Sequence, residues 1–217
     1  MNPKVIGIVG FKNSGKDTSA GYMIQDFGYT KDSFAAPLKD ACAAIFGWDR
    51  DMLEGETLES REWREIVDPY WSHKLGIDDF SPRKALQLVG TEKLREGLHE
   101  DIWILSLSRR VVKISDNVVI TDCRFPNEIE AIRKLNGSVI RIKRGPEPYW
   151  YKLAEEAMVK NLIGPLRELK RIGIHASEYS WVGSDIDYII ENDGSLEDLR
   201  KKVNKLFERF NDRSVSL

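Results

Sequence analysis

Residues 5–18 read VIGIVGFKNSGKDT, a short apolar run followed directly by a glycine-rich turn. The turn has the spacing G-x-x-x-x-G-K between Gly10 and Lys16, and a helical pattern of apolar residues begins after it. Glycines let the backbone turn with its amide N–H groups pointing inward, and a helix N-terminus adds partial positive charge, so this geometry favours an anion. Strand, spacing, lysine and helix agree, which predicts a P-loop whose Lys16 reaches the β- and γ-phosphates of a nucleotide.

Asp17 departs from the usual P-loop pattern, because it stands where a Ser or Thr normally meets the magnesium ion. Three interpretations stay open: Asp17 holds a magnesium-bound water, accepts a hydrogen bond from the loop, or caps the helix. The residues expected to bind the phosphates of the nucleotide are Gly10, Lys12, Asn13, Ser14, Gly15, Lys16, Asp17 and Thr18. A P-loop alone does not choose the reaction, since GTPases, motor ATPases and small-molecule kinases share it.

Further short apolar runs rich in Val and Ile are typical of buried parallel strands. They are Val118 to Thr121, Val139 to Ile142 and Ile186 to Ile190, in addition to Val5 to Val9, and a strand at Lys31 to Phe34 would make five. Helical patterns lie between these runs. The alternation predicts an α/β fold with a parallel, roughly five-stranded sheet flanked by helices.

Two helices have readable ends. In the segment Asn127 to Asn136, Asn127 is the expected N-cap and Gly137 the expected end. The last helix is expected to begin at the cap Ser195. Its apolar face is expected to consist of Leu196, Leu199, Val203, Leu206 and Phe207.

With 217 residues, the chain is expected to form a single P-loop kinase domain, 1–217, with an acceptor-binding insertion at about 48–79 and a lid-like insertion at about 145–185. Lys and Arg number 33 against 35 Asp and Glu, so the overall charge provides no general attraction to nucleic acid. No signal sequence or membrane span is recognised, and we expect a soluble cytoplasmic protein. Cys42 and Cys123 have no metal-ligand spacing and are expected to be buried.

Asp122 and Arg124 follow the apolar run at residues 118–121, so they are expected at the carboxyl edge of the sheet, beside the P-loop. There Asp122 could order magnesium-bound waters or accept a hydrogen bond from the acceptor, and Arg124 could bind a phosphate with its planar guanidinium. The alternative is structural, with Asp122 capping the next turn and Arg124 paired to Glu128. We take Lys16, Asp122 and Arg124 as catalytic candidates, and Asp17 and Asp122 as magnesium candidates, directly or through water.

Two other basic residues follow prolines at expected helix starts. Arg83 comes after Ser81-Pro82, so its side chain belongs to the first turn of a helix, where the backbone amides attract anions. Lys39 lies early in a helical pattern after Pro37, although a lysine at such a place is ordinarily only solvated. Both are candidates for binding a phosphate.

Five blocks occur together in this order: GFKNSGKDT, FAAPLKDA, SPRKALQLVGTEKLR, ITDCRFPNE and DYIIENDGSLEDL. In this combination the chain resembles the phage deoxynucleoside monophosphate kinases of the T-even type. The resemblance covers most of the chain and is weakest in residues 48–79 and 145–185. It implies a nucleoside monophosphate kinase fold, with ATP as the donor and magnesium as the metal.

The resemblance also implies which residues shape the acceptor site. They are Leu38, Lys39, Arg61, Arg83, Gly90, Thr91, Trp103, Arg124 and Glu128. A base-stacking role for Trp103 comes from the resemblance alone, since an aromatic residue inside an apolar run is usually part of a core. The implied reaction is in-line transfer of the γ-phosphoryl group of ATP to a deoxynucleoside monophosphate, in the host cytoplasm if a phage encodes the protein.

Two other functions stay open. A related P-loop kinase would act on a hydroxyl, as in a dephospho-coenzyme A kinase-like enzyme or one that phosphorylates a hydroxymethylated base in DNA, and Asp122 would then act as a base. A regulatory module would bind ATP without transferring phosphate. A small-molecule deoxynucleoside monophosphate is the expected partner, nucleic acid and a homodimer stay open, and no membrane partner is expected.

Overall fold

The computed structural model describes residues 4–114 and 116–213, and these divide into two compact units. The first unit comprises residues 1–33 and 111–217, and the second comprises residues 34–110. The second unit contains the whole of the 48–79 insertion expected from the sequence, while the lid-like segment 145–185 belongs to the first unit. The arrangement as a single domain with two insertions stays a prediction.

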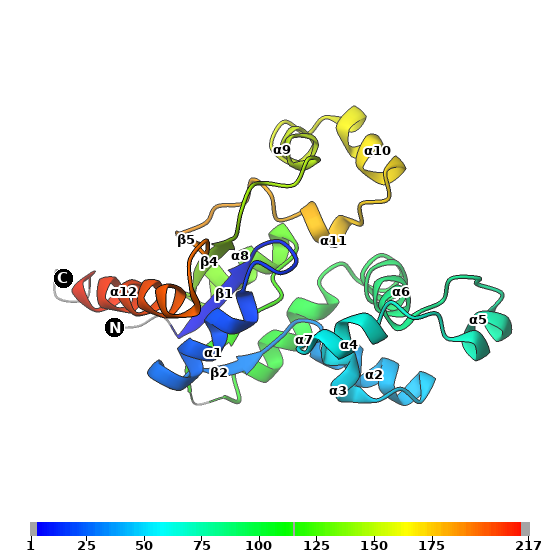
Figure 1. Ribbon diagram of the computed structural model, residues 1–217, viewed down its shortest axis with the longest axis horizontal. Helices are drawn as coiled ribbons and strands as arrows, with labels where there is room; N and C mark the ends of the chain where they lie inside the picture. The colour runs from blue at the N-terminus through cyan, green and yellow to red at the C-terminus, as the bar shows by residue number, and fades with distance from the viewer. Residues whose placement is uncertain (1–3, 115, 214–217) are drawn as a thin grey trace. The chain divides into compact units, whose positions relative to one another are not determined.

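Five strands of the described residues form one sheet in the order β2-β3-β1-β4-β5, and every neighbouring pair is parallel (Figure 1). The strands are β1 Val5–Val9, β2 Thr30–Asp32, β3 Val118–Ile120, β4 Ser138–Lys143 and β5 Tyr188–Glu191. This confirms the predicted α/β fold with a parallel five-stranded sheet. Because the strands run in one direction, their carboxyl ends, including the end of β1 before the P-loop, lie along the same edge.

Helices cover both faces of the sheet. On one face, Ile6 and Ile8 of β1 share an apolar core with residues of α1 Lys16–Phe27 and α12 Leu196–Arg213. On the other face, α8 Pro126–Lys134 packs so closely that a Cβ on Gly7 would lie 3.0 Å from the Ile132 side chain and from the Cys123 sulfur. Cys42 and Cys123 are both buried and free, as expected. The P-loop therefore joins the central strand to a helix that is anchored in the core.

Two of the predicted helix features are wrong. Asn127 does not cap α8, because the helix begins one residue earlier at Pro126, whose fixed φ suits a first turn. Glu128 instead turns back and accepts hydrogen bonds from the amides of Arg124, at 2.7 Å, and Phe125, at 3.1 Å. In α12 the cap at Ser195 is confirmed by its hydroxyl, which accepts from the Asp198 amide at 3.2 Å, but Leu196 is 68% exposed and lies outside the apolar face.

The connection between β4 and β5 contains three short helices of the described chain. They are α9 Tyr151–Met158, α10 Ile163–Arg171 and α11 Ala176–Tyr179 (Figure 1). His175 is the N-cap of helix α11, and its Nδ1 accepts a hydrogen bond from the Ser177 amide at 3.2 Å. The lid-like segment is therefore a helical connection between the neighbouring strands β4 and β5.

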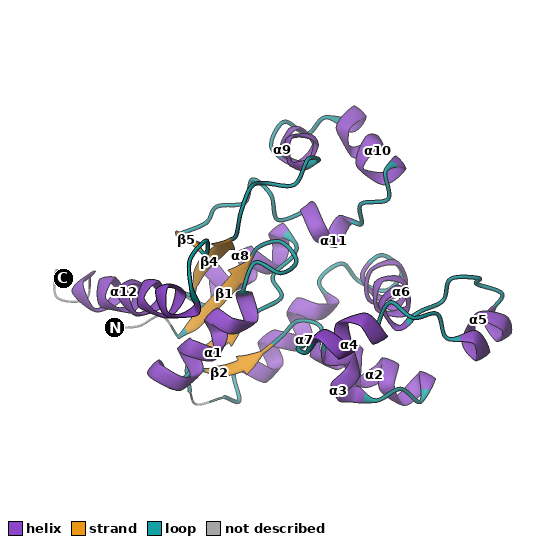
Figure 2. Ribbon diagram, in the orientation of Figure 1, coloured by secondary structure: helices purple, strands orange, loops and turns teal. Residues whose placement is uncertain are grey.

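The regular elements of the second unit, all of whose residues are described, are helices (Figure 2). They are α2 Ala36–Phe46, α3 Arg50–Glu54, α4 Leu58–Trp63, α5 Pro69–Leu75, α6 Pro82–Gln87, the π-helix η1 Leu88–Arg95 and α7 Ile102–Val111, whose last residue falls in the first unit. Phe46, Trp48, Trp71 and Phe80 form an aromatic cluster in this unit, with ring centroids 4.5–6.0 Å apart. In the described part of the chain, none of the helices has the length and apolar character needed to cross a membrane.

Candidate active site

The turn between β1 and α1 has the geometry of a phosphate-binding loop. Gly10 and Gly15 have φ values of 144° and 99°, which L side chains rarely adopt. A Cβ at Gly10 would clash with the carbonyl oxygen of Ile142, and one at Gly15 would clash with the Asn192 side chain. The Ser14 hydroxyl is buried without a hydrogen-bond partner in the described residues. A buried donor inside an otherwise packed turn fits a loop that binds an anion.

Lys16 is the first residue of α1, and its ammonium folds back over the loop. Its Nζ donates to the carbonyl oxygens of Gly10 and Phe11, both at 2.9 Å. Burial, together with the nearby Arg124 guanidinium, lowers the pKa of Lys16 to about 8, and the carboxylates of Asp17, Glu178 and Asp122 oppose this shift. The lysine is held in a site where its positive charge is only partly compensated, so an additional anion would stabilise it.

Asp17 lies in the first turn of α1 with its side chain about half exposed. Its carboxylate is 3.3 Å from the Lys31 ammonium on β2. The N-cap of α1 is Gly15, so the structure contradicts the interpretation of Asp17 as a helix cap. An acidic residue in the first turn still interacts favourably with the helix dipole.

Asp122 and Arg124 lie in the loop that follows β3, close enough to Lys16 for their charges to shift its pKa. The Arg124 guanidinium is 3.3 Å from Oε1 of Glu178 and donates to the Ser177 carbonyl oxygen at 3.2 Å. The expected structural alternative is therefore wrong in one part, because Glu128 binds the Arg124 backbone amide while the side chain pairs with Glu178. Lys16, Asp122 and Arg124 gather at one place, as the sequence suggested.

Magnesium suits this part of the chain. It prefers oxygen ligands and commonly uses one or two carboxylates together with the phosphates of its nucleotide. Asp17 and Asp122 supply carboxylates near Lys16. Within residues 4–114 and 116–213, no three Asp, Glu, His or Cys side chains form a metal site by themselves. The donor set fits a magnesium ion that is held mainly by nucleotide phosphates.

Part of the predicted acceptor set gathers inside the second unit. Trp103 is buried, and its indole N–H donates to the carbonyl oxygen of Gly90 at 2.9 Å. A Cβ on Gly90 would lie 2.5 Å from Cδ2 of Leu38, so a larger residue at position 90 would require the Leu38 side chain to shift. Thr91 is the next residue of the π-helix η1. π-Helical segments are rare and often lie at functional sites.

Lys39 and Arg83 lie close to carboxylates of the second unit. The Lys39 side chain is only 11% exposed and lies 2.7 Å from Glu54. Burial by itself would raise the pKa of the Glu54 carboxyl. The charges and hydrogen bonds of Lys39 and Arg50 outweigh burial and lower this pKa to about 2. Arg83 is 3.4 Å from Glu65. Lys39 is therefore not simply solvated.

Arg61 is oriented by backbone carbonyl oxygens. Its Nε donates to the oxygen of Gly55 at 3.0 Å, and Nη2 donates to that of Glu56 at 3.1 Å. Of the predicted acceptor residues, only Arg124 and Glu128 belong to the first unit; the rest belong to the second.

One residue of the first unit was not singled out from the sequence, and another was predicted only as part of the lid-like segment 145–185. Asn192 is buried directly after β5, and its amide donates to the Ser14 carbonyl oxygen at 2.8 Å, so it holds the P-loop. Because Asn192 follows the carboxyl end of a predicted strand, its position could have indicated a residue of the site. Glu178 faces Arg124, and no sequence signal indicated this pair, because the two residues are 54 positions apart.

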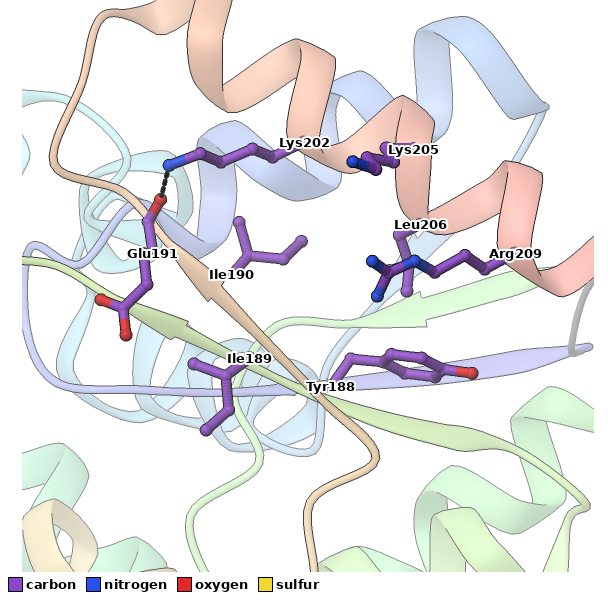
Figure 3. A pocket seen from close by; sticks show the side chains of 8 residues that line it. All are labelled: Tyr188, Ile189, Ile190, Glu191, Lys202, Lys205, Leu206 and Arg209. Atoms are coloured by element: carbon purple, nitrogen blue, oxygen red, sulfur yellow. Dashed lines mark hydrogen bonds between the residues drawn. The ribbon is translucent and has the colours of Figure 1, made fainter.

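A shallow hollow of about 300 Å3 lies elsewhere, between β5 and α12 (Figure 3). Its lining residues are Tyr188, Ile189, Ile190, Glu191, Lys202, Lys205, Leu206 and Arg209. None of the predicted site residues is among them. We therefore locate the candidate site by the P-loop and its neighbours, and not by this hollow.

The sequence is similar to viral kinases. A putative deoxynucleotide monophosphate kinase of Acanthamoeba polyphaga mimivirus is 37% identical over 154 residues, which cover 64% of this chain and 74% of that protein. The deoxynucleoside-5'-monophosphate kinase of Escherichia phage T5 is 31% identical over 181 residues, covering 61% and 72%. The deoxynucleotide monophosphate kinase of Enterobacteria phage T4 is 22% identical, covering 92% and 97%. No protein-family model matches the chain.

Solved structures of similar form include a dephospho-CoA kinase from Campylobacter jejuni, with a TM-score of 0.47 and 16% identity over 97% of this chain and 98% of that one. A shikimate kinase from Aquifex aeolicus has a TM-score of 0.43 and 15% identity, covering 95% and 98%.

Proposed function

This chain belongs to the deoxynucleotide monophosphate kinases, and on that premise we propose that it transfers the γ-phosphoryl group of ATP to a deoxynucleoside monophosphate. Membership follows from the mimivirus and T5 relatives, which are 37% and 31% identical and of which the alignments cover 74% and 72%. The observation that carries the reaction is the gathering of Lys16, Asp122 and Arg124 at the P-loop. The products are ADP and the deoxynucleoside diphosphate.

ATP is the donor, with its phosphates in the turn from Gly10 to Thr18. The amides of the turn and the N-terminus of α1 bind the phosphate oxygens, and Lys16 moves its ammonium from the carbonyl oxygens of Gly10 and Phe11 to the β- and γ-phosphates. Asp17 and Asp122 would hold a magnesium ion, directly or through water, and the ion would supply positive charge that neutralises the phosphates.

Arg124 binds the phosphate of the acceptor. Its guanidinium carries a permanent positive charge and presents paired N–H donors that match two phosphate oxygens. Within the second unit, Arg83, Lys39 and Arg61 supply positive charge for binding a phosphate, and Leu38, Gly90, Thr91 and Trp103 shape a surface for the nucleoside. Glu128 supports the acceptor side indirectly, because its carboxylate holds the backbone amide of Arg124 at 2.7 Å.

The chemical step is an in-line displacement. A phosphate oxygen of the acceptor forms a bond to the γ-phosphorus as the bond from that phosphorus to the β–γ bridging oxygen breaks, and ADP leaves with the electron pair. The attacking oxygen is already ionised near neutral pH, so a strong general base is unnecessary. Positive charge and alignment provide most of the acceleration, and the segments around the site exclude water that would otherwise hydrolyse ATP.

ADP formation tests this function directly. The purified protein receives magnesium ATP with each of the four common deoxynucleoside monophosphates, with dephospho-coenzyme A, with DNA containing hydroxymethylated bases, and with no acceptor. We expect ADP and a matching amount of diphosphate with at least one monophosphate, and none from Lys16→Ala prepared identically. ADP without an acceptor, or only with the hydroxyl acceptors, would refute the proposal.

A further inference from the structure

Helix α11 of the lid-like segment brings a carboxylate to the P-loop site. Oε1 of Glu178 is 3.3 Å from Nη1 of Arg124, and the same nitrogen donates to the carbonyl oxygen of Ser177 at 3.2 Å. The Glu178 side chain is 22% exposed and that of Arg124 is 43% exposed, so the ion pair is only partly shielded from water. One turn of α11 therefore gives Arg124 two acceptors.

Contacts of Trp181 connect this turn to the P-loop. The indole N–H of Trp181 donates to the Glu178 carbonyl oxygen at 3.1 Å, and the Trp181 ring lies 4.9 Å from the ring of Phe11 in the P-loop. The guanidinium of Arg141 on β4 lies 5.0 Å from the Trp181 ring and 5.7 Å from the Phe11 ring. Aromatic and cation–π contacts of this kind restrict the side chains that make them. The position of Glu178 is thus linked to the loop that binds the donor.

The charges around Glu178 explain why a carboxylate is stable there. Lys16 and Arg124 are two positive groups near each other, and each raises the free energy of the other's charged form. Glu178 compensates both, since it pairs with Arg124 and acts electrostatically on Lys16. A phosphate group offers the same two cations more oxygen acceptors and more negative charge than one carboxylate.

We propose that Glu178 is a positioning residue, whose carboxylate holds the Arg124 guanidinium beside Lys16 until a phosphate group of a bound nucleotide replaces it. The inference rests on the proposed function for the identity of that nucleotide, either the ATP donor or the monophosphate acceptor. Glu178 has two consequences. It orients Arg124 in the free protein, and it competes with the incoming phosphate.

Binding without magnesium separates this role from metal binding. Calorimetry in EDTA measures the affinities for ATP, for each deoxynucleoside monophosphate and for inorganic tripolyphosphate. Because partly exposed ion pairs contribute modestly, Glu178→Gln should strengthen binding of at least one ligand about two- to fivefold. The ligand that gains should be the one that Arg124→Ala weakens, and the gain should be absent when both substitutions are combined.

Glu168→Gln is the matched control. It removes a carboxylate of the same segment, one that pairs with Arg171 at 2.7 Å on α10, and should leave all affinities unchanged. If Glu178→Gln does not fold, as judged by its thermal transition, Glu178→Asp keeps the charge but shortens the side chain, and should give a smaller gain in the same direction.

Three outcomes would overturn the inference: no gain for any ligand, a gain that persists without Arg124, or a loss seen only when magnesium is present. The last would identify Glu178 as a metal ligand. Failure of the proposed function remains distinguishable, because tripolyphosphate and ATP binding report on Glu178 even if no monophosphate is phosphorylated.

Discussion

Replacing Lys16 with methionine should abolish turnover and also change how the stability of the protein depends on pH. Methionine has similar length and no charge, so the packing is largely kept while the ammonium that binds the phosphates is lost. In the folded protein the pKa of Lys16 falls from 10.5 to about 8, chiefly because folding removes part of the water around the side chain. The unfolded chain keeps the ordinary value. Between these two pH values the unfolded state therefore binds more protons than the folded state.

The direction and size of the effect follow from this difference. Stability rises with pH wherever the unfolded state binds more protons, so the wild type should gain stability relative to Lys16→Met as the pH rises from about 8 towards 10.5. Each pKa unit corresponds to about 1.36 kcal/mol, which gives about 3 kcal/mol for the whole change. Since Lys16 is only partly shielded from solvent, we expect about 2 kcal/mol.

Urea unfolding of both proteins between pH 7 and 10 measures this gain. The difference between their free energies of unfolding should be constant below about pH 8, and should then move in favour of the wild type. Lys201→Met, an exposed substitution on α12, provides the baseline. A difference between wild type and Lys16→Met that stays flat over the whole range would show that the ammonium is not destabilised in the fold.

The other predictions concern the two substrates, the metal and the packing of the second unit. Arg124→Ala should lower kcat/KM for the monophosphate by about ten- to a hundredfold with little change in ATP affinity, since a charge-assisted contact contributes about 1.5–3 kcal/mol; weaker ATP binding alone would assign Arg124 to the donor. Asp17→Asn should raise the magnesium concentration needed for half-maximal rate, and an unchanged magnesium profile would leave Asp17 as the partner of Lys31 only. Gly90→Ala should destabilise the protein by about 1–3 kcal/mol through its close approach to Leu38. Adding Leu38→Ala should recover part of that loss, and no recovery would exclude the clash as its cause.

The P-loop and the sheet were predictable because their signals are local. The P-loop glycines Gly10 and Gly15, Lys16 and an apolar run lie within fourteen consecutive residues, 5–18, and each constrains the backbone of its own neighbourhood. Four of the five strands were found by their runs of Val and Ile; β1 has the predicted ends, and the ends of the other strands differ by a residue or two from those observed. Asp122 and Arg124 were found because the carboxyl ends of parallel strands share one edge.

Helix caps were harder to predict from the sequence, because several polar residues near a helix start can accept hydrogen bonds from the same backbone amides. At the start of α8, Asn127 looked suitable, but Pro126 occupies the first position and Glu128 reaches back to the amides of Arg124 and Phe125. In α12, Leu196 fits the spacing of the apolar face but lies too close to the helix start to reach the core.

By itself the sequence determined the α/β class, the phosphate-binding turn and the identity of its lysine, because these depend on the backbone preferences of neighbouring residues. Only the tertiary structure decided which charges surround that lysine. Glu178 meets Arg124 across 54 residues, and Asn192 meets Ser14 across 178. Such contacts arise because the spatial arrangement of the strands and their connections brings distant parts of the chain together. The sequence pattern of either partner is the same whether or not they meet, so only the folded chain shows the pair.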